Sequence, residues 1–175
     1  MGTATSKSRA RKKAKTSAPL VVHIHLFKNA GTSIDLALEK YFGRKWVNID
    51  SGQPAGRVTG KDIAELLEAK PKLQAISSHQ VRPSIDKAVK RPIRYVAAIR
   101  HPIARVKSIY DFDLKRGPVT PMGKVAHRLD FPDYVAHFLA ENNQNICNFQ
   151  VRSFSTLRSP RTGKLNSIPL VRHLD

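Results

Sequence analysis

The first residues that could bind a ligand lie in a short polar segment, which follows an apolar run and precedes an amphipathic stretch. This segment contains Lys28, Gly31, Thr32 and Ser33. Backbone N–H groups at the start of a helix bind anions, because they point at the ligand and the helix dipole adds positive charge. Glycine lets the backbone approach the anion closely, and the lysine and the two hydroxyl groups are further donors. The segment therefore predicts a phosphate-binding loop.

The position of the lysine separates this loop from the Walker type. A Walker loop ends in Gly-Lys-Ser or Gly-Lys-Thr. Here Lys28 precedes Gly31, and neither tripeptide follows. The pattern disfavours an ATPase of that class, and a nucleotide kinase would also lack its catalytic lysine and metal-holding acids.

A second set of polar residues starts at Arg100, where another apolar run ends. Arg100 stands at the carboxyl end of a predicted strand, the edge where open α/β sheets bind ligands. Ser108 follows about two helical turns later. A guanidinium and a hydroxyl at these positions suit a second phosphate. Taken separately, each residue is better explained otherwise: Arg100 as the partner of a carboxylate, and Ser108 as a solvated helix residue.

Alternating apolar runs and amphipathic stretches surround both sets of residues. Strands that alternate with helices predict an α/β domain, with a parallel sheet covered on both faces. Pro102 suits a first helical turn, and Gly117 suits a helix end. We predict strands at 20–26, 46–49, 73–77 and 93–99, helices at 32–42, 61–69, 102–116, 132–141 and 142–154, and no clear element at 159–175.

Together, these motifs resemble the PAPS-dependent sulfotransferases. The stretch HIHLFKNAGTSIDLAL resembles the 5′-phosphosulfate loop of that family, and IRHPIARVKSIYDF resembles its 3′-phosphate motif. The segment 148–152, NFQVR, is similar to a segment of the carbohydrate branch that includes the uronyl 2-O-sulfotransferases. Phe27, Ala30 and His101 depart from the usual proline, glycine and aspartate. Family members also continue well beyond the third motif.

The resemblance implies a P-loop-like parallel sheet with a helical C-terminal part, and a sulfotransferase that moves a sulfuryl group from PAPS to a carbohydrate hydroxyl. It also implies that the reaction needs no metal. The excess of lysine and arginine suits an anionic acceptor, either a carbohydrate or another hydroxyl compound. Lys28 would stabilise the leaving 5′-phosphate, and Arg100 and Ser108 would hold the 3′-phosphate. The donor-binding residues carried over are Lys28, Asn29, Ala30, Gly31, Thr32, Ser33, Arg100 and Ser108.

His79 is the candidate general base for the acceptor hydroxyl. It follows a predicted strand, and imidazole has a suitable pKa range for proton transfer. The carbohydrate branch carries a histidine in a similar place. The alternative is a loop histidine that is bonded to backbone.

His23 and His25 alternate on one predicted strand and face the same side of the sheet. A metal pair is conceivable, but no carboxylate or thiolate lies at a useful spacing in the sequence. We therefore expect no metal, and a structural or loop-positioning role for His25. Asp35 is expected to be a helix-surface acid that pairs with a nearby lysine or arginine.

The chain of 175 residues has a net charge of +18, which calls for anionic partners. Its single cysteine, Cys147, excludes an intrachain disulfide.

We expect a disordered basic tail at 1–18, a nucleotide-binding domain at 19–158 and an irregular, shortened segment at 159–175. No apolar leader or membrane span is apparent, which predicts a cytoplasmic protein. The alternatives are a truncated homologue that binds the nucleotide without catalysis and a basic nucleic-acid-binding module, although no specific nucleic-acid motif is present.

Overall fold

The fold was analysed in a computed structural model of the chain. The expected tail at 1–18 lies outside the described residues except for Ala18, and the expected segment at 159–175 lies outside them except for 165–166. None of the described helices is long and apolar enough to cross a membrane. The structure describes residues 18–53, 56–83, 85–154, 157–158 and 165–166.

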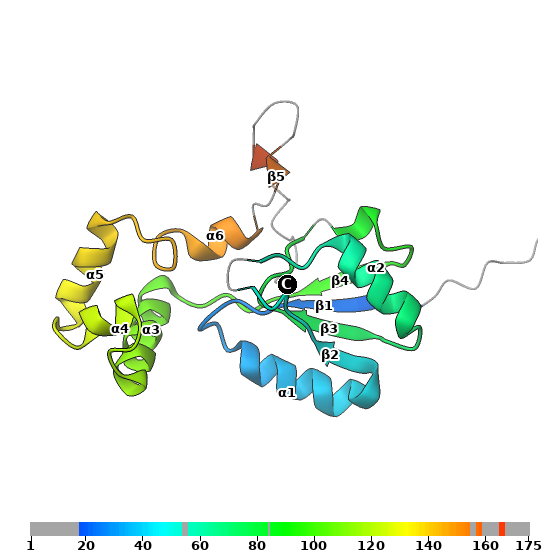
Figure 1. Cartoon of the computed structure of the whole chain (residues 1–175), viewed down its shortest axis with the longest axis horizontal. Helices are drawn as coiled ribbons and strands as arrows, with labels where there is room; N and C mark the ends of the chain where they lie inside the picture. The colour runs from blue at the N-terminus through cyan, green and yellow to red at the C-terminus, as the bar shows by residue number, and fades with distance from the viewer. Residues whose placement is uncertain (1–17, 54–55, 84, 155–156, 159–164, 167–175) are drawn as a thin grey trace, which may run out of the picture.

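Four parallel strands form the central sheet, in the order β2-β3-β1-β4 (Figure 1). The prediction of a parallel α/β sheet is confirmed. All four predicted strands are present, although each is shorter than the apolar run that predicted it. Their bounds are β1 Leu20–Ile24, β2 Trp46–Asn48, β3 Ala75–Ser78 and β4 Ile93–Val96.

Strand β1 lies inside the sheet, paired with β3 on one side and β4 on the other. Leu20, Val22 and Ile24 are almost completely buried, and so is His23 between them. A parallel strand covered on both faces reads as a continuous apolar run, which is why this segment was recognisable. The consequence for function is that the loop after β1 leaves the middle of the sheet.

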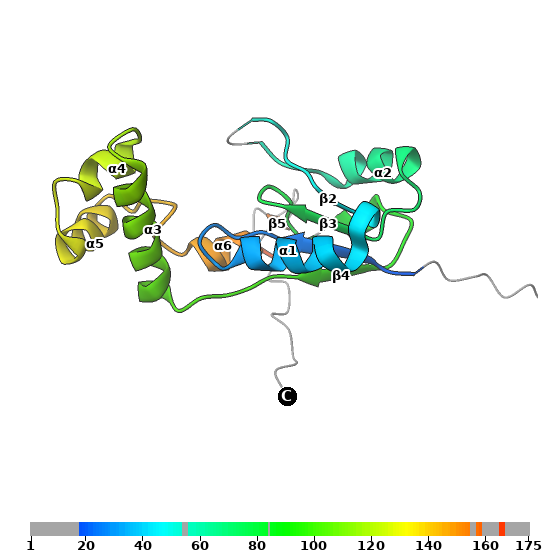
Figure 2. The ribbon, with the colours of Figure 1, turned by 90° about the horizontal axis from the view of Figure 1, so that it is seen from below.

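One helix covers each face of the sheet (Figures 1 and 2). Helix α1 spans Gly31–Phe42 and continues through a 3₁₀ turn at Gly43–Lys45 into β2. Helix α2 spans Gly60–Ala69, and Thr59 and Asp62 cap its start reciprocally. The outer side of α1 is less covered than its apolar spacing predicts, since Leu36 and Tyr41 are 61% and 82% exposed.

A small helical layer lies beyond the carboxyl ends of the strands (Figure 1). Its core contains Val106, Ile109, Tyr134 and Phe138. Helix α3 begins at Pro102, as predicted, and ends at Gly117, whose φ of 86° is in the region that favours glycine. The helices of this layer are α3 Pro102–Arg116, α4 Pro121–Ala126 and α5 Phe131–Ala140, and a 3₁₀ turn, η2 Ile85–Lys87, precedes β4.

Three local predictions need correction. The sequence did not indicate α4, which Thr120 caps by accepting a hydrogen bond from the Gly123 N–H. The helix predicted at 142–154 is confined to α6, Phe149–Phe154, because Asn142 and Asn148 adopt left-handed φ values of 48° and 52°. Beyond it, β5 Leu157–Arg158 and β6 Leu165–Asn166 pair antiparallel.

Candidate functional site

The predicted phosphate-binding loop connects the carboxyl end of β1 to the first turn of α1. Lys28 and Ala30 adopt left-handed φ values of 62° and 60°, and Ala30 is the N-cap of the helix. In the described part of the chain, the backbone N–H groups of Lys28, Ala30, Gly31 and Thr32 form no hydrogen bond. Donors without partners at a helix start form a concave anion site.

Gly31 is required at the start of α1 because the imidazole of His25 fills the space beside it. A Cβ atom at Gly31 would lie 2.1 Å from Cδ2 and 2.2 Å from Nε2 of His25. His25 therefore supports the loop from below. This agrees with the loop-positioning role expected for it from the sequence.

Asn29 faces the protein interior, with only 2% of its surface exposed. Its backbone N–H donates to the carbonyl oxygen of Leu26 at 3.2 Å. Its Nδ2 atom donates to the carbonyl oxygen of Ala98 at 2.9 Å and to Oε1 of Gln150 at 2.5 Å. Asn29 thus joins the loop to the segment after β4 and to α6, while Thr32 and Ser33 on the other side of the turn are exposed.

Helix α3 approaches the loop along one of its faces. Nε of Arg105 donates to the carbonyl oxygen of Phe27 at 3.1 Å, and Nζ of Lys28 lies 4.6 Å from the ring centre of Phe112. Ser108 is three residues after Arg105 and four before Phe112, so it lies on the same face of the helix. The half-buried Ser108 is thereby directed towards the loop.

Arg105 is the largest fully buried side chain in the protein's described part. Besides its bond to Phe27, its Nη1 atom donates to the carbonyl oxygen of Asn145 at 2.8 Å, and its guanidinium lies 4.2 Å from the ring centre of Phe149. Burial lowers the pKa of Arg105 to about 10. A buried charge that binds three different segments holds them together.

The exposed Arg100 precedes α3 and is held by its backbone. Oε1 of Gln150 accepts from the Arg100 N–H at 2.9 Å, and Nε2 of Gln150 donates to the Arg100 carbonyl oxygen at 2.8 Å. The same Oε1 atom accepts from Asn29. The fold therefore connects the two predicted phosphate-binding segments through one glutamine.

A histidine and carboxylate cluster lies under the loop, and here the sequence-based expectation for Asp35 was wrong. Oδ1 of Asp35 lies 2.8 Å from Nδ1 of His23. Oδ2 of Asp35 lies 2.7 Å from Nδ1 of His25. Both histidines belong to the β1 segment and Asp35 to α1, so packing brings together residues that are not neighbours in the sequence. The carboxylate missing from the sequence pattern is thus supplied by the helix.

Burial and hydrogen bonding together set the protonation state of this cluster. Burial lowers the pKa of His23 and of His25, and the nearby His79 lowers that of His25 further. Burial opposes ionisation of Asp35, but hydrogen bonds from Ser77 and the histidines hold its pKa below the usual value. The three side chains are therefore two neutral imidazoles that donate Nδ1–H to one carboxylate.

His79 follows β3 and stands beside the cluster. Its Nδ1 atom lies 2.9 Å from the carbonyl oxygen of His25, and the two rings are 3.9 Å apart. Because a carbonyl only accepts, Nδ1 carries a proton, and Nε2 has no hydrogen-bond partner among the described residues. Asp50 fixes the turn, since its Oδ1 accepts from the His79 N–H and the Ser78 hydroxyl. Both sequence-based interpretations of His79 are compatible with this geometry, because one nitrogen is bonded to backbone and the other is free.

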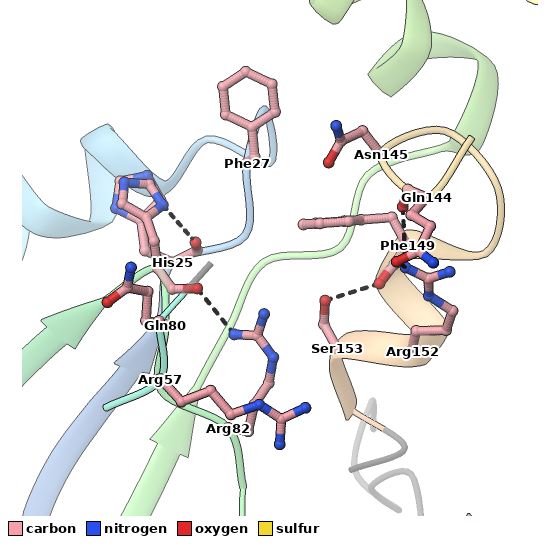
Figure 3. Close-up of a pocket in the computed structure, with 12 residues that line it drawn as sticks. His25, Phe27, Arg57, Gln80, Arg82, Gln144, Asn145, Phe149, Arg152 and Ser153 are labelled. Carbon is pink, nitrogen blue, oxygen red and sulfur yellow. Dashed lines mark hydrogen bonds between the residues drawn. The ribbon is translucent and has the colours of Figure 1, made fainter. Parts of the chain in front are cut away.

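A cavity of about 700 Å³ opens at the carboxyl ends of β1 and β3 (Figure 3). His25, Phe27, His79 and Gln80 line it on the sheet side. Figure 3 shows Arg57 and Arg82 on that side, and residues of α6 and its preceding loop opposite them. The remaining lining residues are Gly56, Gln144, Asn145, Phe149, Arg152 and Ser153.

The cavity is strongly basic. Three arginines line it, and none of the described residues in its wall is acidic. Burial, and then the charge of Arg57, lowers the pKa of Arg82, whose Nη1 donates to the carbonyl oxygens of His79 and Val81. Arg152 donates to Oε1 of Gln144 at 3.0 Å. Together these groups favour an anionic ligand.

The structure brings the predicted residues together in two groups rather than in one crevice. Lys28, Arg100 and Ser108 are gathered around the loop and α3, whereas His79 lines the basic cavity. Among the described residues, Phe27 belongs to both, since it lines the cavity and its carbonyl binds Arg105.

Neither the cavity position of Arg57 and Arg82 nor the pairing of Asp35 with the histidines was predicted from the sequence. Arg82 carried a usable signal, because it follows a predicted strand closely on the ligand-binding edge of the sheet. Arg57 lies in a loop rich in glycine and proline, and no sequence pattern marked it as a ligand-binding residue. Arg152 and Gln150 were noticed only as part of a short motif.

The comparisons with known proteins give no functional name. No protein-family model matches the chain, and no solved structure matches it. The chain is similar to an uncharacterized protein of Archaeoglobus fulgidus, with 31% identity over 161 residues. This match covers 89% of the chain and 62% of the archaeal protein, so the chain spans less than two thirds of that relative.

Proposed function

We propose that the protein is a PAPS-dependent sulfotransferase that acts on a hydroxyl of an anionic carbohydrate. One observation carries the proposal: a helix-start loop with unbonded N–H groups lies next to a basic cavity that contains a histidine with a free Nε2 atom. The P-loop-like character of the sheet is part of this proposal. It is supported by the position of the loop, between an inner parallel strand and a helix.

The donor site of the proposed enzyme is the loop together with α3. The N–H groups of Lys28, Ala30, Gly31 and Thr32 would stabilise negative charge on the departing 5′-phosphate. The Lys28 ammonium, now over Phe112, would add a full positive charge near the same group. Arg100 and Ser108 would bind the 3′-phosphate, and this second anchor would align the donor before reaction.

The acceptor site of the proposed enzyme is the basic cavity. Arg57, Arg82 and Arg152 would bind the carboxylates or sulfates of the sugar chain. The acceptor oxygen attacks sulfur while the bond between sulfur and the 5′-phosphate oxygen breaks. The hydroxyl proton moves to Nε2 of His79, which is possible because Nδ1 already carries a proton.

Binding of adenosine 3′,5′-bisphosphate, measured by calorimetry, tests the donor site. The unmodified chain should bind the bisphosphate, and Lys28→Ala and Arg100→Ala should each abolish binding at micromolar ligand. Lys124→Ala is a matched control, because Lys124 is exposed on α4 and its removal changes the net charge equally. The absence of binding to the unmodified chain would overturn the proposal.

Transfer of labelled sulfate from PAPS to a panel of uronate-containing and sulfated glycans tests the reaction itself. A labelled glycan is the expected product. Nucleotide binding without transfer to any glycan would instead support a non-catalytic nucleotide-binding protein. Binding to nucleic acid that weakens steeply with salt and ignores Lys28→Ala would favour the basic-module alternative.

A further inference from the structure

Three segments that are distant in the sequence meet at the side chain of Gln150. Its Oε1 atom accepts from Nδ2 of Asn29, 121 residues away, and from the backbone N–H of Arg100, 50 residues away. Its Nε2 atom donates to the Arg100 carbonyl oxygen. Gln150 therefore connects the loop after β1, the segment after β4 and α6 by direct hydrogen bonds.

The bond to Asn29 bears on the shape of the loop. Asn29 lies between Lys28 and Ala30, both of which adopt left-handed φ values that non-glycine residues avoid. Such strain persists only where the surroundings fix the backbone. The buried Asn29 amide, held by Gln150 and by the carbonyl oxygen of Ala98, supplies that constraint.

The bonds to Arg100 bear on the direction of its side chain. Gln150 binds both the N–H and the carbonyl oxygen of the same residue, so the local backbone cannot rotate without breaking a hydrogen bond. The exposed guanidinium consequently starts from a backbone of fixed position. A cation placed in this way loses less conformational freedom when it binds an anion.

We propose that Gln150 is a positioning residue that sets the separation between the phosphate-binding loop and Arg100. This inference rests on the proposed function, since it concerns how the two phosphates of one donor are held together. With Gln150 in place, the loop and Arg100 bind the 5′- and 3′-phosphates of the same molecule at once. Without it, each segment binds its phosphate as a separate site, and the advantage of the second phosphate is lost.

The test compares two ligands, adenosine 3′,5′-bisphosphate and adenosine 5′-monophosphate, by calorimetry. Their affinity ratio reports the contribution of the 3′-phosphate. Gln150→Ala should reduce this ratio about tenfold, the equivalent of about 1.4 kcal/mol. Val151→Ala should leave the ratio unchanged, because Val151 is the next residue of α6 and is 59% exposed. A general loss of folded protein would lower both affinities equally and leave the ratio as it is.

Asn29→Ala, alone and combined with Gln150→Ala, tests whether the two residues act as one unit. The double variant should lose no more of the ratio than the more damaging single variant. Multiplicative losses would contradict coupling between them. Gln150→Met preserves the length of the side chain. If Gln150→Ala does not fold, Gln150→Met should reduce the affinity ratio in the same way.

The two proposals fail in different ways. No bisphosphate binding to the unmodified chain would overturn the proposed function. Bisphosphate binding with a ratio that Gln150→Ala and Gln150→Met leave unchanged would overturn only the positioning role of Gln150.

Discussion

Asp35 accepts a hydrogen bond from His25, with 2.7 Å between Oδ2 and Nδ1. The carboxylate belongs to α1 and the imidazole to the end of β1, so this bond fixes the first helical turns against the strand. The imidazole in turn occupies the space beside Gly31. The predicted phosphate-binding loop thus rests on a hydrogen-bonded pair whose protonation depends on pH.

Acid should destabilise the fold in two stages. Burial lowers the pKa of His23 and His25 in the folded state, so the unfolded chain takes up these protons first and stability falls as the pH drops below 6.5. Each histidine contributes at most about 1.4 kcal/mol per pH unit. The lowered pKa of Asp35 adds a second loss as the pH falls below 3.8. Chemical denaturation between pH 8 and pH 3 measures both stages.

His23→Gln should flatten the first of these stages, because it removes one buried imidazole. His101→Gln is the control, since His101 is exposed at the start of α3 and should leave the profile as it is. Equal profiles for the unmodified chain and for His23→Gln would contradict the assignment.

Gly31→Ala should destabilise the protein by about 1–3 kcal/mol, the usual result of overpacking. The added methyl group would collide with the His25 ring, and the loop would have to move. Denaturant unfolding measures the loss. Gly31→Ala should cost less in a His25→Ala background than in the unmodified chain, whereas an equal cost in both backgrounds would show that the collision is not the cause.

Ala30→Gly should stabilise the protein by about 0.5–1 kcal/mol. Ala30 holds a left-handed φ of 60°, a conformation that glycine adopts without steric cost. Ala37→Gly is the opposite control, because this exposed alanine lies inside α1, where glycine is unfavourable. A lower thermal midpoint for Ala30→Gly would contradict the strain at this position.

Arg105→Lys should cost about 2–4 kcal/mol despite the retained charge. A lysine cannot bind the carbonyl oxygens of Phe27 and Asn145 in the same forked geometry while stacking on Phe149. Arg128→Lys, at an exposed site, should be neutral. Denaturant unfolding distinguishes the two variants, and similar stability for both would show that the buried guanidinium does not hold these segments.

His79→Ala should leave the affinity for adenosine 3′,5′-bisphosphate unchanged and lower the rate of sulfate transfer about 100- to 10,000-fold. The cavity position of His79, apart from Lys28 and Arg100, is the reason for this separation. The measurements are calorimetry and the labelled-sulfate assay. Equal loss of both properties would mean that His79 is structural.

The parts of the fold carried by local sequence patterns were predictable. A continuous apolar run marked β1, and Pro102 marked the start of α3. Both are properties of a few neighbouring residues. The exposed outer side of α1 was not predictable, because spacing alone does not say whether another element covers Leu36 and Tyr41.

The same distinction holds for the candidate site. The loop at Lys28 and the segment at Arg100 were indicated by short motifs at strand ends. The partnership of Asp35 with His23 and His25 depends on how α1 packs against β1, across 12 and 10 residues of chain. The glutamine that joins the two motifs acts across 121 and 50 residues, which no local pattern records.

The cavity has one wall from the loops that follow β1 and β3 and the loop containing Arg57, and another from the segment 144–153. During synthesis, the four strands leave the ribosome before the second wall does. Arg57 and Arg82 on the sheet side are therefore made before the residues that face them across the cavity. Enclosure of the cavity thus depends on the last of its lining segments to be made, residues 144–153.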